Sequence, residues 1–169
     1  MKRWLSCLTL GCSNLSLLPL IVIMDSSNNN RFSKILFWNV RGINSQEKWD
    51  AIKDKINESA CQVLCLQETK RETFDSFYIK KFCPRNLDQF AYFPFVGASG
   101  GLLTMWNSSL FDGTVVQSNS YAITVKLLCR PDNKAFLSTT FMALPTLQRN
   151  KVLSPSSWIL ILLTMRIGF

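Results

Sequence analysis

The sequence contains no histidine among its 169 residues. This absence excludes Ser-His-Asp and Cys-His nucleophilic arrangements, zinc sites with imidazole ligands and any imidazole general base. The six cysteines show no Cys-x-x-Cys spacing, so we expect reduced thiols that pack as small hydrophobic side chains. An enzyme built from these residues is therefore restricted to carboxylates, amides and a bound metal ion.

Acidic residues are also scarce, and none follows Asp132. The 11 Asp and Glu residues stand against 19 Lys and Arg, which gives a net charge of +8. Such an excess favours a polyanionic partner, because neutralised phosphates release counterions, although it can equally serve solubility. Hydrophobic residues make up 47% and charged residues 18%, which excludes a disordered chain and allows one domain with a core.

The first thirty residues lack the complete pattern of a targeting segment. Residues 1–23 combine a basic start with apolar stretches, but no alanine precedes Ala51, so an Ala-x-Ala-like cleavage site is missing. Neither apolar stretch reaches the about 20 residues of a membrane helix. We therefore expect residues 1–30 to be a leader without an assigned structure, with Met24 as an alternative start, and we expect no secretory or membrane location. A small secreted or membrane-associated protein that uses residues 1–23 stays as an alternative.

The middle of the chain shows clear periodicities. Residues 34–40 form a continuous apolar run, which is typical of a strand covered on both faces, and residues 63–66 form a second one. Between them, Asn44 and Glu47 resemble a capping box, and the apolar residues that follow recur at helical spacing. Strand, helix and strand at this spacing predict a βαβ unit with parallel strands.

Shorter elements follow this unit. The Phe-rich stretch 74–82 predicts a short helix or loop that packs on the sheet. Alternating or apolar runs separated by turn residues then predict an antiparallel meander, with strands at 91–95, 102–106, 121–127 and 135–139. The sequence thus predicts a mixed α/β fold that begins with βαβ and continues as antiparallel strands.

Polar residues lie at the carboxyl ends of the two parallel strands. Asn39 ends the first strand and Glu68 follows the second, where ligands gather in open α/β sheets. Carboxylate and amide oxygens suit Mg²⁺, which accepts few protein ligands. Lys70 lies two residues beyond Glu68, where it can orient the carboxylate or meet a phosphate. The alternative is that Glu68 and Lys70 end a strand in water and that Asn39 makes a turn.

The motifs WNVRG at 38–42 and LQETK at 66–70, followed by Ser-Gly-Gly-Leu at 99–102, resemble the endonuclease/exonuclease/phosphatase superfamily. They are most similar to the apurinic-endonuclease-like nuclease domain of plant LINE-type retrotransposons, which do not carry long terminal repeats. This resemblance implies a four-layer, deoxyribonuclease-I-like α/β sandwich and Mg²⁺-assisted hydrolysis of DNA phosphodiesters in the nucleus. By position, it implies a metal and catalytic site at Asn39 and Glu68, nucleic-acid contacts at Arg41 and Lys70, and a structural turn at Ser99, Gly100 and Gly101. Arg41 departs from DNA-repair relatives, which often carry Asp at this position.

Later motifs of the family do not occur in the sequence. The Gly-Asp-Phe-Asn and Ser-Asp-His motifs are absent, and the latter requires histidine. We therefore expect residues 31–138 to be a truncated domain that is catalytically incompetent as written. The segment Thr-Thr-Phe-Met-Ala-Leu at 139–144 can encode Asn-Ile-Tyr-Gly-Pro in a shifted frame, so we expect residues 139–169 to be out of frame.

Two further expectations follow from this interpretation. A sheet that lacks the second half of its sandwich should leave an uncovered apolar face, which predicts poor solubility and non-cooperative melting. A non-catalytic, basic nucleic-acid-binding remnant is the alternative function, favoured by the charge of +8. DNA is the expected partner, no small-molecule cofactor is expected, and the oligomeric state stays open.

Overall fold

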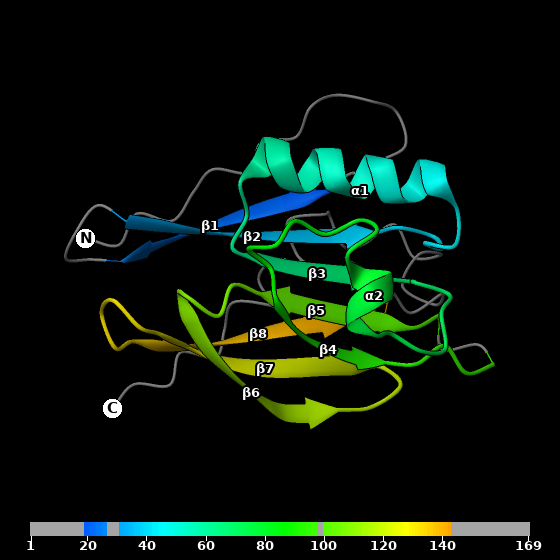
Figure 1. Ribbon diagram of the computed structural model, residues 1–169. Helices are drawn as coiled ribbons and strands as arrows, with labels where there is room; N and C mark the ends of the chain where they lie inside the picture. Colours follow the sequence, from blue (N-terminus) through cyan, green and yellow to red (C-terminus); the bar gives the residue numbers. More distant parts are fainter. Residues whose placement is uncertain (1–18, 27–30, 98–99, 143–169) are drawn as a thin grey trace, which may run out of the picture.

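The computed structural model describes residues 19–26, 31–97 and 100–142, which form two β-sheets and two helices (Figure 1). The elements in chain order are β1 (Leu20–Ser26), β2 (Arg31–Asn39), α1 (Gln46–Ser59), β3 (Val63–Gln67), α2 (Ser76–Ile79), β4 (Gln89–Phe93), β5 (Leu102–Trp106), β6 (Phe111–Ser118), β7 (Ala122–Cys129) and β8 (Ala135–Phe141). None of the helices in these ranges is long and apolar enough to cross a bilayer.

The predicted βαβ unit forms the centre of a five-stranded sheet with the order β1-β2-β3-β5-β4. β2 and β3 are parallel, with Ile35 opposite Val63 and Asn39 opposite Gln67. The other neighbouring pairs in this sheet are antiparallel. Both central strands are apolar on two sides because helices cover one face and the second sheet covers the other. The parallel pair is confirmed.

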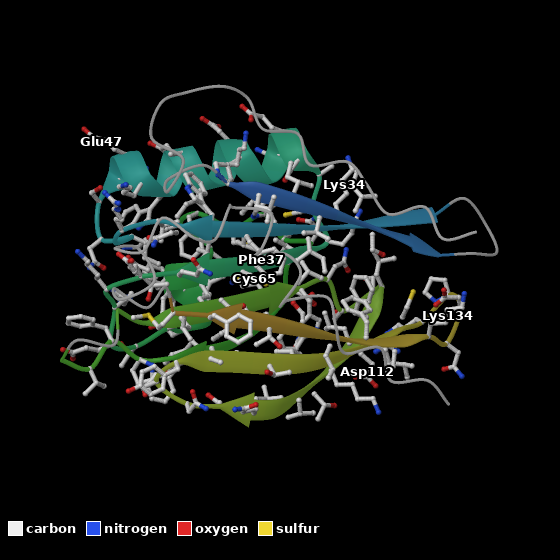
Figure 2. The ribbon with its side chains drawn as sticks, turned by 180° about the vertical axis from the view of Figure 1, so that it is seen from behind. Lys34, Phe37, Glu47, Cys65, Asp112 and Lys134 are labelled. Carbon is white, nitrogen blue, oxygen red and sulfur yellow. The ribbon has the colours of Figure 1, made fainter. Side chains whose placement is uncertain are left out.

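α1 covers the outer face of this sheet with an apolar stripe. Ile52 and Ile56 are buried in one cluster with residues of β2 and β3. The helix follows Ser45, whose extended backbone marks the N-cap but whose side chain makes no capping hydrogen bond. The predicted cap at Asn44 was wrong, because the Asn44 amide nitrogen donates to the Lys70 carbonyl at 2.9 Å. Glu47, its predicted capping partner, lies on the outer side of the helix (Figure 2).

The Phe-rich stretch forms the one-turn helix α2, whose cap Asp75 accepts a hydrogen bond from the Tyr78 backbone N–H. Phe74 and Phe82 are buried in the cluster that also contains the apolar face of α1. Phe77, in contrast, is 77% exposed. The predicted packing is therefore confirmed for the stretch as a whole and wrong for Phe77, because a single helical turn directs neighbouring residues to different sides.

β6, β7 and β8 form a second, antiparallel sheet rather than a continuation of the first. The strand predicted at 121–127 is confirmed as β7, with Ile123, Val125 and Leu127 fully buried, but Ala122 and Thr124 between them are buried as well, so a half-buried alternation is seen only in part. Tyr121, the first residue of the predicted strand, lies outside β7 and is 64% exposed. β7 and β8 are joined by a turn that lies between the predicted strands 121–127 and 135–139.

β6 has no counterpart in the sequence prediction. Its register shifts between Val115 and Gln117, which breaks the period-two pattern of a strand. Both Val115 and its neighbour Val116 are about half exposed. The strand forms because it pairs with β7 and packs on the first sheet through Phe111 and Gly113.

Gly113 allows close packing between the two sheets. A Cβ atom at this position would overlap the indole ring of Trp106 on β5. The Trp106 side chain is buried, with 5% of its surface exposed. We expect Gly113→Ala to lower the free energy of unfolding by about 1–3 kcal/mol, the usual effect of overpacking a core. Urea denaturation followed by circular dichroism measures this change. An unchanged midpoint would show that the two sheets can move apart to accept the methyl group without loss of stability.

The two sheets pack face to face around a shared core. Figure 2 shows Phe37 and Cys65 in the layer between β2, β3 and β8. The core also contains two polar contacts between the sheets: the Thr104 and Thr140 hydroxyls lie 2.7 Å apart, and Cys65 Sγ lies 3.5 Å from Ser138 Oγ. The apolar members are Val22, Ile35, Phe37, Val63, Cys65, Leu102, Trp106, Phe111, Ile123, Val125 and Leu127. The expectation of an uncovered inner face was wrong, because β6–β8 cover it.

The predicted fold class, a mixed α/β sandwich, is confirmed. The described residues form three layers, which are the helices, the five-stranded sheet and the three-stranded sheet. In Figure 1, α1 lies at one side of the molecule and β6 at the opposite side. A second layer of helices, which the resemblance implies, does not occur in residues 19–26, 31–97 or 100–142.

The predicted segment boundaries are not element boundaries in the structure. Residues 20–26, which belong to the expected leader, form β1 and pair with β2. Residues 139–141, the start of the expected out-of-frame tail, belong to β8 and pair with β7. Residues 1–18 and 143–169 lie outside the described part of the chain, so the division at 1–30, 31–138 and 139–169 stays a prediction.

Cys61, Cys65 and Cys83 are buried thiols outside any disulfide, as expected, and Cys129 is partly exposed. Burial raises the pKa of Cys65 to about 11 and that of Cys83 to about 12. These two sulfurs are therefore protonated at neutral pH and behave as small apolar groups.

Candidate functional site

The carboxyl ends of β2, β3 and β8 meet at one end of the sandwich, at the right of Figure 1. Asn39 is the last residue of β2, and Glu68 follows the last residue of β3. Because β2 and β3 are parallel neighbours, their ends bring these two residues to the same edge of the sheet. Asn39 and Glu68 therefore lie together at the predicted strand ends, and their role as a metal and catalytic site stays a prediction.

The backbone conformation of Glu68 decides which face its side chain occupies. Ile35, Phe37 and Asn39 alternate onto the inner face of the sheet, whereas continued alternation from Leu64 through Leu66 would direct residue 68 to the helix-covered face. Glu68 instead has a φ of 53°, in the left-handed region. This break in the strand pattern allows the Glu68 side chain to meet Asn39.

The two side chains are in direct contact. Asn39 Nδ2 donates to Glu68 Oε1 at 2.7 Å. On its other side, Asn39 Oδ1 accepts from the Arg41 backbone N–H at 3.2 Å. These two bonds fix the orientation of the amide, so that its nitrogen and not its oxygen faces the carboxylate. In this geometry Asn39 acts as an orienting group for Glu68, and the second carboxylate oxygen of Glu68 is not used in this contact.

A ladder of backbone hydrogen bonds holds the loops around this pair. The Gly42 N–H donates to the Glu68 carbonyl at 2.7 Å, and the Lys70 N–H donates to the Gly100 carbonyl at 2.8 Å. Thr69 N–H likewise donates to the Gly101 carbonyl at 3.1 Å. The loops after β2 and β3 and the loop before β5 thus form one connected platform, which reduces the freedom of Glu68.

Gly100 and Gly101 fit closely against the site. Both have a left-handed backbone, with φ of 73° and 77°. A Cβ atom on Gly100 would lie 2.8 Å from Met142 Cε and 3.3 Å from Glu68 Cγ. The predicted structural turn therefore touches the carboxylate side chain, while Ser99, its third predicted member, lies outside the described residues.

Arg41 and Lys70, the predicted nucleic-acid contacts, are both exposed next to the pair. Both also have a left-handed backbone, with φ of 48° and 51°. The Lys70 side chain lies beside Gly42, where a Cβ atom would be 3.7 Å from Lys70 Cδ. Their positions place two cations on the solvent side of Glu68, and their contact with nucleic acid stays a prediction.

The donor set limits which metal the site can hold. Glu68 offers hard carboxylate oxygens, whereas the Asn39 amide presents its nitrogen to this carboxylate and its oxygen to the Arg41 N–H, so the predicted role of Asn39 as a direct metal ligand is not supported by this geometry. The described part of the chain contains no cluster of three or more His, Cys, Asp or Glu residues that could hold a metal. Zinc and calcium sites require more protein ligands than this. Mg²⁺ fits better, because it keeps several waters and binds through one or two carboxylates.

The sequence analysis did not single out the group that follows Lys70. Arg71, Tyr78 and Lys81 line a pocket of about 610 Å³ beside the site. The guanidinium carbon of Arg71 lies 3.3 Å from the centroid of the Tyr78 ring. No motif marks these residues, because α2 brings Tyr78 and Lys81 against the loop after β3 only in the folded chain.

No protein-family model and no curated protein sequence matches the chain. Among solved structures, it is similar to the AP endonuclease LMAP from Leishmania major, with 20% identity over 64% of this chain and a TM-score of 0.49. It is also similar to the human Nocturnin catalytic domain with a bound sulfate anion, with 17% identity over 62% of this chain and a TM-score of 0.47. The aligned regions cover 39% and 47% of those two chains, so this chain spans less than half of either protein.

Proposed function

We propose that this chain carries the metal-binding part of a Mg²⁺-dependent phosphodiesterase site that acts on DNA. The observation that carries the proposal is the hydrogen bond of 2.7 Å between Asn39 Nδ2 and Glu68 Oε1 at the carboxyl edge of two parallel strands. A carboxylate held by an amide, among exposed cations, is suited to an ion that bridges protein and phosphate.

In this proposal each site residue has a distinct role. Glu68 binds Mg²⁺, and Asn39 holds the carboxylate in place by its hydrogen bond. When bound, Mg²⁺ would supply positive charge that stabilises the phosphoryl and leaving oxygens. Arg41 and Lys70, both exposed, contact the DNA backbone. Ser99, Gly100 and Gly101 act structurally: Gly100 leaves space for the Glu68 side chain, and Gly101 leaves space for Thr69 and Phe95.

We also propose that the 169 residues alone do not hydrolyse DNA at a useful rate. Their sequence has no histidine and no Gly-Asp-Phe-Asn motif. By the family resemblance, these motifs would orient the attacking water and contact the phosphate, and loss of such groups costs orders of magnitude in rate. Descent from a retrotransposon nuclease domain is part of the same proposal and rests on the WNVRG and LQETK motifs.

Metal binding gives a direct test of the site. We expect Mg²⁺ to raise the thermal midpoint of the wild-type protein, because a ligand at about ten times its Kd stabilises the folded state by about 1.4 kcal/mol. Glu68→Gln should remove this effect. The matched control is Glu47→Gln, an exposed glutamate on α1, which should keep the full shift. An equal Mg²⁺ shift in the Glu68→Gln protein would contradict the proposed ligand.

A nicking assay on supercoiled plasmid separates binding from catalysis. We expect no Mg²⁺-dependent nicking by the wild-type chain above the level of Glu68→Ala. Nicking that depends on Glu68 would show that the chain is a competent enzyme and would overturn the proposal of incompetence.

The second candidate is a basic nucleic-acid-binding protein that needs no metal. The net charge of +8 favours it. Its signature is DNA binding in EDTA that weakens steeply with salt and does not change in Glu68→Gln. Absence of binding at low salt would exclude it.

A further inference from the structure

A pocket of about 610 Å³ opens next to the candidate site. It begins at Lys70, two residues after Glu68, and we call it the cation pocket. The residues that matter for its chemistry are Trp49, Lys70, Arg71, Tyr78 and Lys81, all of which line it. The full lining also includes the aromatic Phe95 and the carboxylate of Glu72, so the pocket combines three cationic side chains and three aromatic rings with one acidic side chain.

The aromatic rings hold two of the cations in place. Arg71 Cζ lies 3.3 Å from the Tyr78 ring centroid, and Lys81 Nζ lies 4.5 Å from the Trp49 ring centroid. The rings themselves are anchored, because the Tyr78 hydroxyl and the Trp49 indole N–H both donate to the Ile43 carbonyl. Cations fixed in this way lose little freedom when an anion binds.

None of these three cations forms an ion pair in the part of the chain that the structure describes, although Glu72 also lines the pocket. The ion pairs found there are Lys55–Glu58 and Lys134–Asp132, and both lie elsewhere. Arg71 Nε is buried without a hydrogen-bond partner. Because no ion pair has to be broken first, the cations that line the pocket are available to an anion that enters it.

A large exposed aromatic side chain lies near Lys81, one of the cations that line this pocket. Phe77 is 77% exposed, although the next two residues of α2, Tyr78 and Ile79, are buried. Lys81 Nζ lies 5.8 Å from the Phe77 ring centroid. An exposed ring beside fixed cations is the arrangement used to bind unpaired nucleotides, in which bases stack on the ring and phosphates meet the cations.

We propose that the cation pocket binds a phosphodiester of a nucleic-acid strand while Phe77 stacks on an unpaired base of the same strand. A base inside a duplex presents its faces to its neighbours and cannot stack on a side chain. The preferred ligand is therefore single-stranded, or has an unpaired base, next to the position held by Glu68. The binding itself does not require the proposed metal function; only the placement beside a reacting phosphodiester rests on it.

The neighbouring residues Lys80 and Lys81 offer a matched pair for the test. Both are exposed, but Lys81 lines the cation pocket and Lys80 lines a different cavity. The full chain and its variants Lys81→Gln, Lys80→Gln and Phe77→Ala are titrated against a short fluorescent oligothymidylate in EDTA, over a series of salt concentrations. The same titrations use a blunt duplex and an oligomer of abasic spacers, which keeps the phosphates but has no bases.

Each substitution has its own expected signature. Phe77→Ala should weaken binding of the single strand about tenfold and leave binding of the abasic oligomer unchanged. Lys81→Gln should weaken binding of both and reduce the salt slope by about one, whereas Lys80→Gln should have a clearly smaller effect. Wild-type protein should prefer the single strand to the duplex, and Phe77→Ala should remove that preference. Because Phe77 is exposed, its variant should keep the wild-type thermal midpoint.

Other outcomes overturn the proposal. Equal losses in Lys80→Gln and Lys81→Gln would show general charge attraction only. An unchanged single-strand affinity in Phe77→Ala, or tighter binding of the duplex, would exclude the stacking site. If inorganic phosphate or a free nucleoside triphosphate binds the pocket and the oligomer does not compete with it, the pocket is a site for a small ligand instead.

Failure of this inference can be told apart from failure of the proposed function. Strand binding is measured in EDTA, whereas the proposed function is tested by the Mg²⁺ shift of Glu68→Gln. If the oligomer titrations give the expected results but Glu68→Gln keeps the wild-type Mg²⁺ shift, the pocket proposal stands and the proposed metal site fails. If Glu68→Gln loses the Mg²⁺ shift but the oligomer titrations do not give the expected results, only the pocket proposal fails.

Discussion

Replacing Phe111 with alanine should lower the free energy of unfolding by about 3–5 kcal/mol, the usual loss for a fully buried phenylalanine. Phe111 begins β6, is 1% exposed and belongs to the core between the two sheets. Its ring meets that of Phe136 on β8 edge-to-face, with centroids 5.7 Å apart. The substitution therefore leaves a cavity where the second sheet packs on the first. Urea denaturation of both proteins measures the loss.

The exposed Phe77 gives a control of the same chemistry. Phe77→Ala removes an equal side chain that is 77% exposed, so the free energy of unfolding should change by less than about 0.5 kcal/mol. Because the sheets share one core, we also expect circular dichroism and tryptophan fluorescence to report a single transition. Two separate transitions would show that the second sheet unfolds by itself, as the sequence-based expectation of non-cooperative melting requires.

Replacing Gly101 with alanine should lower the free energy of unfolding by about 2–4 kcal/mol. Part of this loss, about 1–2 kcal/mol, comes from placing an L side chain at a left-handed φ of 77°. The rest comes from overpacking, because the new Cβ atom would lie 2.5 Å from Thr69 Oγ1 and 3.2 Å from the Phe95 backbone nitrogen. Since Thr69 follows Glu68, the same shift should also weaken the Mg²⁺ response.

A double-mutant cycle separates the two causes. Thr69 is fully buried, and its hydroxyl has no hydrogen-bond partner among the described residues. Thr69→Ala removes the atom that Gly101→Ala would approach most closely, so the effect of Gly101→Ala should shrink to about 1–2 kcal/mol in that background. An unchanged effect would assign the whole loss to backbone strain and the Phe95 contact. Thermal and urea denaturation of the four proteins provide the cycle.

Much of the first sheet could be predicted from residue patterns. The apolar runs that contain Leu36 and Leu64 predicted two central strands, and the helical spacing of Ile52 and Ile56 predicted the helix between them. These patterns arise because each element buries a defined face, and burial favours the same residue types wherever it occurs. The mixed α/β class followed from their order along the chain.

The second sheet was harder to predict because its evidence is not local. β6 contains a glycine, a register shift and two half-exposed valines, so its sequence lacks a strand period. The strand exists because β7 pairs with it and Trp106 packs on Gly113. For the same reason, the cover that β6–β8 provide for Phe37 and Cys65 could not be deduced from either segment alone.

The sequence by itself determined which residue types lie at the ends of β2 and β3, since Asn39 and Glu68 are fixed by their distance from two apolar runs. It also determined that histidine chemistry is excluded. Only the tertiary structure decided that these two side chains meet at 2.7 Å, that the amide nitrogen faces the carboxylate, and that Arg71 and Lys81 share a pocket with Tyr78. The physical reason is that strand alternation alone would place residues 39 and 68 on opposite faces of the sheet. The left-handed backbone of Glu68, with a φ of 53°, turns its side chain to the face of Asn39 instead. Hydrogen bonds from neighbouring loops to the carbonyls of Glu68 and Gly100 hold this conformation, and no local sequence pattern predicts these contacts.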